Sequence, residues 1–429
     1  MNRREVVITG MGLITALGSN VEENWANLKA LRTGIRFHPK DGLPSALQHF
    51  GRVAHCELPD HIPQKLQGEM RFLNRGALLG LVAACEAVQQ SGARLSGVPP
   101  GRRALYIASG DATKVGYDFM HPAIREAADS RWENVDIQQL NDATLHKVNP
   151  FFLLESIHNN LFSFLSAFLE FRGPNTSLAS LSPYGGQALE LAFRSIRGHR
   201  ADVALAVGYG NWITEIPLYE LEGLGLLSKC QSGANSFRPF DRSRDGFIPG
   251  EGGAALFLEA AEAAMDRGAT VWGKIKGSGN CIEPSPGQGI SVAPHINRRS
   301  IHMALEEAGW PLGDLGFISA HGSATQKGDR SELQSIQDVM DAEKANVPVC
   351  GLKPYTGHMG AASDLAEVVL GISAIRHHMV PATPNFRQAE KAFSGLSISA
   401  SHRPCEKDVF LSLSYGMGGQ SSSVIISAS

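Results

Sequence analysis

Short apolar, β-rich runs alternate with helical patterns along this chain of 429 residues, and this alternation limits what it can fold into. Parallel strands need crossover connections, and helices are the usual crossovers. The pattern predicts an α/β fold: a mixed, mainly parallel, buried sheet with helices on both faces. The expected strands are Val6–Thr9, Ala104–Ala108, Ala201–Gly208, Gly316–Ala320, Val347–Cys350, Val409–Leu413 and Ser422–Ile426. The expected helices are Ala77–Gln90, Gly186–Ile196, Asn297–Gly309, Ser331–Asp341 and Ser363–His377.

The chain is too long for one ordinary core, which predicts two large halves. The same strand and helix order recurs in the second half, with no obvious repeat of sequence. We place the boundary near Glu259–Gly268 and expect an N-terminal half over residues 1–258 and a C-terminal half over residues 259–429. Gly10, which follows the first strand candidate, is interpreted as a turn, and Gly208 is expected to end its strand.

Charge and composition exclude several classes of protein. A net charge of −3 gives no electrostatic reason to expect nucleic acid or an anionic membrane as a partner. The six cysteines lack CxxC or Cys/His metal spacing, so we expect free, mostly buried thiols, no metal site and a reducing, cytoplasmic location. The N-terminal residues lack the apolar segment of a signal peptide.

One segment, Phe151–Phe171, is rich in Phe and Leu and resembles a membrane span in composition. It also carries polar and charged side chains, including Glu155 and His158, that would be costly in hydrocarbon. We therefore expect no membrane span and interpret the segment as a buried or interface helix.

The segment from Thr176 to Gly186 places a serine where an exposed nucleophile would lie. Ser182 follows an apolar run and precedes a helix, whose N-terminus would stabilise negative charge there. Pro183 suits the first helical turn. The simpler interpretation is that Ser182 only caps the helix.

Two histidines and a lysine lie on turns in the second half. His321 follows a strand, His358 lies in a Thr-Gly-His turn, and Lys353 precedes that turn. Two such imidazoles could donate Nε2–H bonds to one thioester or enolate oxygen. Taken singly, each of these residues has an ordinary structural or surface explanation. The glycine-rich segments match neither a phosphate loop nor a dinucleotide fingerprint.

Taken together, the motifs resemble the β-ketoacyl-[acyl-carrier-protein] synthase family of the elongating type. The matching pieces occur in the family's order and cover nearly the whole chain: Val7–Gly12, Pro239–Asp241, Asp245–Phe247, Gly250–Gly252, His321–Thr325, Gly328–Asp329 with Glu332, Lys353 with Thr356–His358, and Ser414–Gly419. The resemblance implies a thiolase-like fold of two topologically similar halves in five layers, αβαβα.

The resemblance also implies a site. His321 and His358 would be the catalytic histidines, beside Lys353 and with Ser182 at the nucleophile position. Supporting positions would be Asp329, Glu332, Thr325 and Thr356, and the oxyanion or gate loop would be Gly416, Met417 and Gly418.

The family's reaction is acyl transfer to a cysteine, decarboxylation of malonyl-carrier protein and Claisen condensation. The implied partners are an acyl carrier protein and a second subunit, in a homodimer or a heterodimer with a paralogous ketosynthase. The carrier protein would bring the phosphopantetheine arm, so no metal or dissociable cofactor is expected. Phe151–Phe171 would contribute to the dimer interface and the acyl tunnel.

The chain departs from the family at the nucleophile. Ala-Cys-Ser/Thr-Ser-Gly becomes Leu181–Gly185 here, with Ser182 replacing the cysteine. Met417 replaces a phenylalanine, Gln420-Ser421 replaces Thr-Asn, and Ala361–Asp364 replaces Gly-Ala-Ala-Gly. A serine hydroxyl has a far higher pKa than a thiol, and a helix dipole contributes only ~1 kcal/mol against that difference.

Three hypotheses follow for a protein of fatty acid or polyketide biosynthesis that acts on acyl- or malonyl-carrier-protein thioesters. The first is a ketosynthase or acyltransferase that uses Ser182 with a histidine as base. The second is a non-catalytic subunit, like a chain-length factor, that pairs with a cysteine-bearing ketosynthase. The third is a malonyl-carrier decarboxylase. The lost cysteine favours the second, and the retained His321, His358 and Lys353 favour the first and third.

Overall fold

A computed structural model describes residues 3–40, 43–110, 117–155, 157, 159–179, 182–285 and 291–428. Its strands are β1 Val6–Thr15, β2 Ile35–Phe37, β3 His49–Gly51, β4 Arg103–Ser109, β5 Asn175–Ala179, β6 Val203–Asn211, β7 Glu251–Ala260, β8 Gly273–Ile282, β9 Phe317–Ala320, β10 Val349–Gly351, β11 Met379–Val380, β12 Arg403–Pro404, β13 Val409–Tyr415 and β14 Gln420–Ser427. Its α-helices are α1 Val21–Lys29, α2 Gln64–Gln67, α3 Arg75–Ser91, α4 Tyr117–Ala127, α5 Ile137–Lys147, α6 Phe152–Glu155, α7 Asn160–Leu169, α8 Tyr184–Arg197, α9 Glu215–Gly223, α10 Ala261–Asp266, α11 Arg298–Ala308, α12 Gln326–Glu343, α13 Lys353–Thr356 and α14 Ala361–Arg376.

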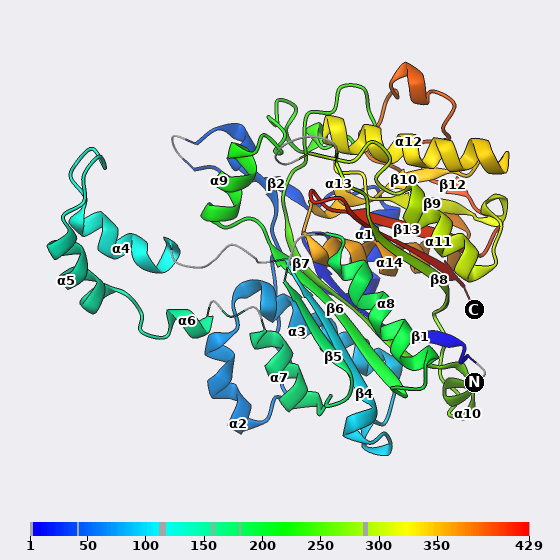
Figure 1. Ribbon diagram of the computed structural model, residues 1–429, viewed down its shortest axis with the longest axis horizontal. Helices are drawn as coiled ribbons and strands as arrows, with labels where there is room; N and C mark the ends of the chain where they lie inside the picture. The colour runs from blue at the N-terminus through cyan, green and yellow to red at the C-terminus, as the bar shows by residue number, and fades with distance from the viewer. Residues whose placement is uncertain are drawn as a thin grey trace.

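The large sheet has the strand order β10-β9-β13-β14-β8-β1-β7-β6-β4-β5 (Figure 1). In its N-terminal part β1, β4, β5 and β6 run one way and β7 runs the opposite way. In its C-terminal part β8, β9, β10 and β13 run one way and β14 is reversed. The two parts therefore have the same topology, and they meet where β1 pairs with β8. The α/β fold with a mixed, mainly parallel sheet is confirmed.

The segments that follow β5, β9 and β10 carry Ser182, His321 and Lys353. Because β1 and β8 are antiparallel, the parallel strands of the two halves run in opposite directions. The segments of the two halves meet where α14 packs against α8, and Ser182 and His321 line one pocket there. The boundary predicted between residues 258 and 259 falls near the end of β7, ahead of α10 and β8.

The turn predicted at Gly10 and the strand end predicted at Gly208 were wrong. Strand β1 continues through Gly10 to Thr15, and β6 continues through Gly208 to Asn211. A Cβ at Gly10 would lie 1.9 Å from the Ala87 carbonyl oxygen of α3. A Cβ at Gly210 would lie 2.1 Å from the Met359 carbonyl oxygen. These glycines let a helix and a site loop approach the sheet closely.

Helix α14 lies in the middle of the molecule and is buried from Ala361 to Ile375. It packs against α8 and against β6, β7 and β13. A helix that is apolar on all sides is one that belongs in a core. Its few charged residues in the buried span, Asp364 and Glu367, are therefore unusual.

The Phe151–Phe171 segment is not one helix. It contains the short helix α6 and then α7, whose Leu161, Phe164 and Leu165 pack in the same apolar cluster as α3. Residues 156 and 158 lie outside the described part of the chain. Helices α4 and α5 pack on each other away from the sheet (Figure 1). No helix within the described ranges is long and apolar enough to cross a membrane.

The prediction of free, mostly buried thiols is confirmed. All six thiols are free, four of them are buried, and Cys56 and Cys281 are partly exposed.

Candidate active site

Ser182 lies between β5 and α8, as the sequence predicts, and its side chain is buried. Residues 180 and 181 lie outside the described part of the chain. The N-cap position of α8 is Pro183, so Ser182 does not cap the helix and Pro183 precedes the first turn. The Ser182 hydroxyl instead donates to the Gly360 carbonyl oxygen at 3.1 Å.

His321 and His358 come together in the same pocket as Ser182. His321 follows β9, and His358 lies between α13 and α14. Their ring centroids are 5.1 Å apart, at an interplanar angle of 72°. The His358 ring also stacks on Trp212, with centroids 4.7 Å apart, and lies 4.9 Å from Phe247. The C-terminal half thus delivers both imidazoles to a position at the nucleophile loop of the N-terminal half.

Hydrogen bonds at Nδ1 fix the protonation of both imidazoles. His358 Nδ1 accepts the Gly360 N–H at 3.2 Å. His321 Nδ1 lies 3.2 Å from the Lys353 ammonium, which can only donate. These contacts assign the proton of each neutral ring to Nε2. Burial, with Lys353 as a further cause, holds the pKa of both histidines well below the usual range.

Lys353 connects His321 with the buried acid Glu367 of α14. Its ammonium donates to the His321 carbonyl oxygen at 2.6 Å and to Glu367 Oε1 at 2.8 Å. Lys353 and Glu367 are both nearly inaccessible to solvent. Burial raises the pKa of Glu367, and the adjacent Lys353 ammonium opposes that rise by favouring the ionised carboxylate. The lysine therefore holds the backbone and the ring of His321 at once.

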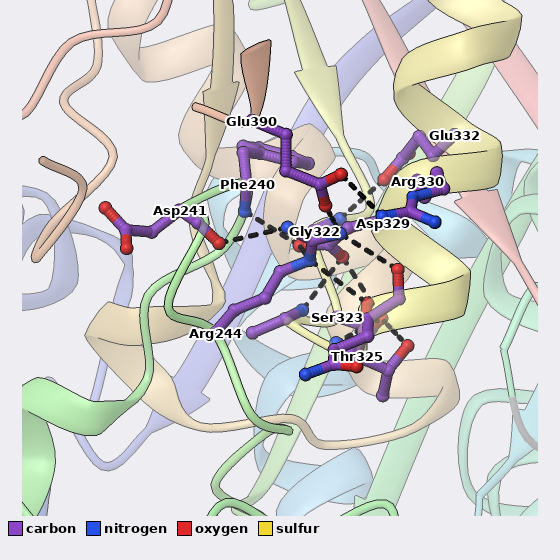
Figure 2. Close-up of polar contacts among 12 residues, drawn as sticks. Phe240, Asp241, Arg244, Gly322, Ser323, Thr325, Asp329, Arg330, Glu332 and Glu390 are labelled. Atoms are coloured by element: carbon purple, nitrogen blue, oxygen red, sulfur yellow. Dashed lines mark hydrogen bonds and ion pairs between the residues drawn. The ribbon is translucent and has the colours of Figure 1, made fainter. Parts of the chain in front are cut away.

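A pair of acids on α12 supports the loop that carries His321. Glu332 accepts the N–H groups of His321 and Gly322 at 2.7 and 2.9 Å. Asp329 accepts the N–H groups of Phe240 and Ala324 and the Ser323 hydroxyl. Figure 2 shows Glu332 beside Gly322, and Asp329 beside Phe240 and Ser323, at the first turns of α12. Burial raises the pKa of Glu332 to about 8 and that of Asp329 to about 6.

Arg244 forms ion pairs with two acids near the loop that carries His321. Its guanidinium lies 3.5 Å from Asp329 and 2.6 Å from Glu390, which also pairs with Arg330 (Figure 2). Because Arg244 is almost fully buried, it is a fixed countercharge for the acids below the His321 loop.

The other predicted positions divide into two groups. Thr325, Gly416 and Met417 line the pocket with the histidines. Thr356 is buried and its hydroxyl donates to the Gly357 carbonyl oxygen. Gly418 is exposed, and the Gly416 N–H donates to the Gln420 carbonyl oxygen within the turn. The Gly416 N–H is thus engaged within its own loop.

The pocket itself is narrow and mostly apolar. Its cavity volume is about 70 Å3, and Trp212, Leu221, Leu226, Phe247, Val292 and Met417 form its apolar wall. That volume holds about five water molecules. A larger groove of about 620 Å3 lies outside it and shares Leu226, Val292, Thr325 and Met417 with it. Within the described residues, none of Phe151–Phe171 lines the pocket, so the expected tunnel contribution is not seen in this chain.

Sequence reasoning missed several residues of the site. Glu367 and Asp364 were not assigned a place beside Lys353, and Trp212 and Phe247 were not connected with His358. The signal for the acids was available, because two carboxylates three residues apart on a wholly buried helix require partners. No group of three or more His, Cys, Asp or Glu side chains in the described ranges could hold a metal ion.

The fold and the converging loops define a thiolase-like α/β protein of the condensing-enzyme class. The β-ketoacyl synthase N-terminal domain matches residues 3–264 and the C-terminal domain matches residues 275–387. The chain belongs to the β-ketoacyl synthase family.

Relatives and solved structures agree with this assignment. The chain is 27% identical to a 3-oxoacyl-[acyl-carrier-protein] synthase 2 of Staphylococcus aureus, covering 89% of this chain and 87% of the relative. It is 29% identical to a putative polyketide beta-ketoacyl synthase 1 of Streptomyces cyaneus, covering 99% and 98%. A beta-ketoacyl synthase structure from Burkholderia phymatum matches with a TM-score of 0.84 and 25% identity over 99% and 100% of the two chains. The ishigamide ketosynthase/chain length factor has the same fold, with a TM-score of 0.83, 23% identity and full coverage of both chains.

Proposed function

We propose that this chain acts on malonyl thioesters of an acyl carrier protein in fatty acid or polyketide biosynthesis, and that it decarboxylates them without using Ser182 as an acyl acceptor. The observation that carries the proposal is the protonation of the two imidazoles. His321 and His358 share one pocket, and each keeps its Nε2–H as a donor because its Nδ1 accepts a hydrogen bond.

Two such donors suit the decarboxylation step. As the bond between the malonyl α-carbon and its carboxylate breaks, CO2 leaves and the electron pair moves into the thioester to form an enolate. The two Nε2–H groups would stabilise the enolate oxygen, as preorganised donors do for oxyanions. The α-carbon of the enolate then takes up a proton from water, which leaves an acetyl thioester on the carrier protein. The reaction needs no nucleophile from the protein.

The surroundings of Ser182 argue against acyl transfer to its hydroxyl. A serine nucleophile needs an adjacent general base. The Ser182 hydroxyl donates to a backbone carbonyl, and the described imidazoles of the pocket have their accepting nitrogens engaged. Neither imidazole is therefore placed to act as the general base for Ser182 in the described arrangement, and the carboxylate nearest its hydroxyl, Asp364, already accepts the Gly185 N–H.

The pocket and groove fit a short malonyl group delivered on a phosphopantetheine arm. The groove of about 620 Å3 opens beside the narrow pocket and would hold the arm, and the apolar wall leaves little room for a long acyl chain. In this proposal the cofactor arrives on the carrier protein and the chain itself keeps none.

A second candidate function is a non-catalytic subunit that pairs with a cysteine-bearing ketosynthase. The small volume of the pocket and the engaged Ser182 hydroxyl favour it, because both remove acyl-acceptor chemistry. The likeness to the ishigamide ketosynthase/chain length factor shows the fold alone.

The test follows malonyl-loaded acyl carrier protein by intact mass in the presence of the purified chain. We expect conversion to the acetyl form with no adduct on the chain. His321→Ala and His358→Ala should each lower the rate by about 10²–10³-fold, the range for loss of one oxyanion donor. Ser182→Ala should stay within about threefold of the wild type.

Three other outcomes contradict the proposal. An acyl adduct that disappears in Ser182→Ala would establish the serine enzyme. Absence of decarboxylation, together with stable co-purification with a cysteine-bearing ketosynthase, would establish the subunit. Decarboxylation that survives both histidine substitutions would remove the proposed mechanism.

A further inference from the structure

Asp364 is a buried carboxylate at the N-terminus of α8, the helix that follows Ser182. It lies in the first turn of α14 and its side chain is buried. Asp364 Oδ2 accepts the Gly185 N–H at 3.0 Å. The Ser182 hydroxyl and the Gly186 N–H also stabilise its ionised form. A side chain from the second half therefore serves as the anion of the α8 N-terminus, where α8's own cap residue provides no side-chain bond.

The close approach of the two helices depends on a glycine. A Cβ at Gly185 would lie 2.3 Å from the Ala361 carbonyl oxygen and 2.9 Å from Asp364 Cβ. The Gly360 carbonyl, one residue before α14, accepts the Ser182 hydroxyl. The start of α14 thus holds both the serine and the first turn of the helix behind it.

The charges around Asp364 favour its ionised form near neutral pH. It lies at the positive ends of two helices, α14 and α8, and Lys353 adds a full positive charge. Burial opposes these effects, and the pKa of Asp364 is raised to about 6. The second acid on this face, Glu367, pairs with Lys353, and His358 is held neutral. The α8 N-terminus is consequently already occupied by a negative charge of the protein itself.

We propose that Asp364 is a positioning residue that occupies the anion-stabilising end of α8 and so keeps position 182 from carrying a negative charge. An alkoxide, a thiolate or a thioester oxyanion at that position would face this carboxylate and compete with it for the same N–H groups. The inference rests on the proposed function in one respect: both hold that position 182 is not acylated. It adds the residue responsible and makes the acidity of position 182 depend on α14.

A cysteine placed at position 182 reports this effect directly. Ser182→Cys is compared with Ser182→Cys/Asp364→Asn by the rate of iodoacetamide alkylation across pH 5–10, with modification at residue 182 followed by peptide mass. With Asp364 present, we expect a thiol pKa above about 8.5, its ordinary value. With asparagine, the free helix N-terminus should lower that pKa by at least about one unit and speed alkylation at pH 7 about tenfold.

Two controls keep the test specific. Ser182→Cys/Glu343→Gln removes one exposed carboxylate at the far end of α12 and should leave the alkylation profile unchanged. Ser182→Cys/Asp364→Ser, with its smaller polar side chain, should reproduce the asparagine result if the first variant unfolds. Thermal unfolding and alkylation of the partly exposed Cys56 and Cys281 monitor the fold.

An alkylation profile at residue 182 that stays within about twofold when Asp364 is replaced would overturn the inference. This readout uses no carrier protein and no malonyl group. Absence of decarboxylation therefore leaves it intact, whereas an acyl adduct on Ser182 would contradict both proposals, and failure here leaves the histidine chemistry intact.

Discussion

Two buried acids in this protein accept N–H groups from loops at the ends of parallel strands, and they act in opposite directions. Glu332 accepts the N–H groups of His321 and Gly322 after β9. Asp364 accepts the N–H of Gly185, in the first turn after the β5 loop. The first arrangement presents a hydrogen-bond donor to the pocket. The second engages the backbone N–H donors at the start of α8 that an anionic nucleophile would need.

Under the proposed function, the difference separates two parts of a condensing reaction, enolate stabilisation and acyl transfer. The loops after β9 and β10 hold two neutral imidazoles and a lysine in a dense network of contacts. The loop after β5 has a serine bound to a backbone carbonyl and a helix end that is already neutralised. Enolate stabilisation needs only the first set, whereas acyl transfer needs both.

The largest expected effect comes from replacing Lys353, which contacts His321. Lys353→Met leaves Glu367 buried without its partner, and Asp364 loses a countercharge. We expect the free energy of unfolding to fall by about 3–5 kcal/mol, the usual cost of breaking a buried ion pair on one side. Urea denaturation measures it.

The matched control is Lys353→Met/Glu367→Gln, which removes both charges. It should recover a substantial part of the lost stability, because no unpaired charge then remains at residue 367. An unchanged stability in Lys353→Met alone would show that the two acids do not depend on the lysine.

The next effect is expected from Glu332→Gln, which converts one of the two accepting oxygens into an amide donor facing an N–H group. We expect a loss of about 1–3 kcal/mol in the free energy of unfolding, the range for leaving a buried hydrogen-bonding group unsatisfied. Decarboxylation should fall more than stability alone explains, because the loop of His321 loses its support. Urea denaturation and the malonyl assay together measure both, and Glu343→Gln on the exposed end of α12 is the control.

A smaller effect is expected from a substitution at Ser182. Ser182→Ala removes the hydrogen bond to the Gly360 carbonyl, and we expect a loss of about 1 kcal/mol in the free energy of unfolding. The malonyl assay should show little change. A loss of decarboxylation comparable to that of His358→Ala would contradict the proposal that decarboxylation depends on the histidines and not on Ser182.

The sequence could predict the positions of His321, His358 and Lys353 better than the surroundings of Ser182. Alternating apolar runs identified most strands and helices, and motif order brought His321, His358 and Lys353 together. The predicted ends of β1 and β6 were wrong because a glycine in a sequence is compatible both with a turn and with close packing against a strand. Here α3 and the Met359 loop approach the two strands closely, and this packing depends on tertiary structure. The place of Asp364 depended on how α14 packs against α8, which no local pattern specifies.

The smallest expected effect is the absence of titration at the two catalytic histidine candidates. Burial and Lys353 keep the pKa of His321 and His358 well below 6.5, so both rings should stay neutral as pH falls from 7.5 to 6. In the unfolded chain these rings become protonated near 6.5. Their contribution to stability is therefore fully present above 6.5 and is lost as pH falls below it.

Nuclear magnetic resonance of labelled imidazoles follows the two rings through this interval, and the resonances of His321 and His358 should not shift between pH 7.5 and 6. In Lys353→Met, the pKa of both buried rings should rise, because the repelling ammonium is gone. A midpoint near 6.5 for either ring in the wild type would mean that its Nε2–H is not the fixed donor on which the contrast between the two sides of the pocket depends.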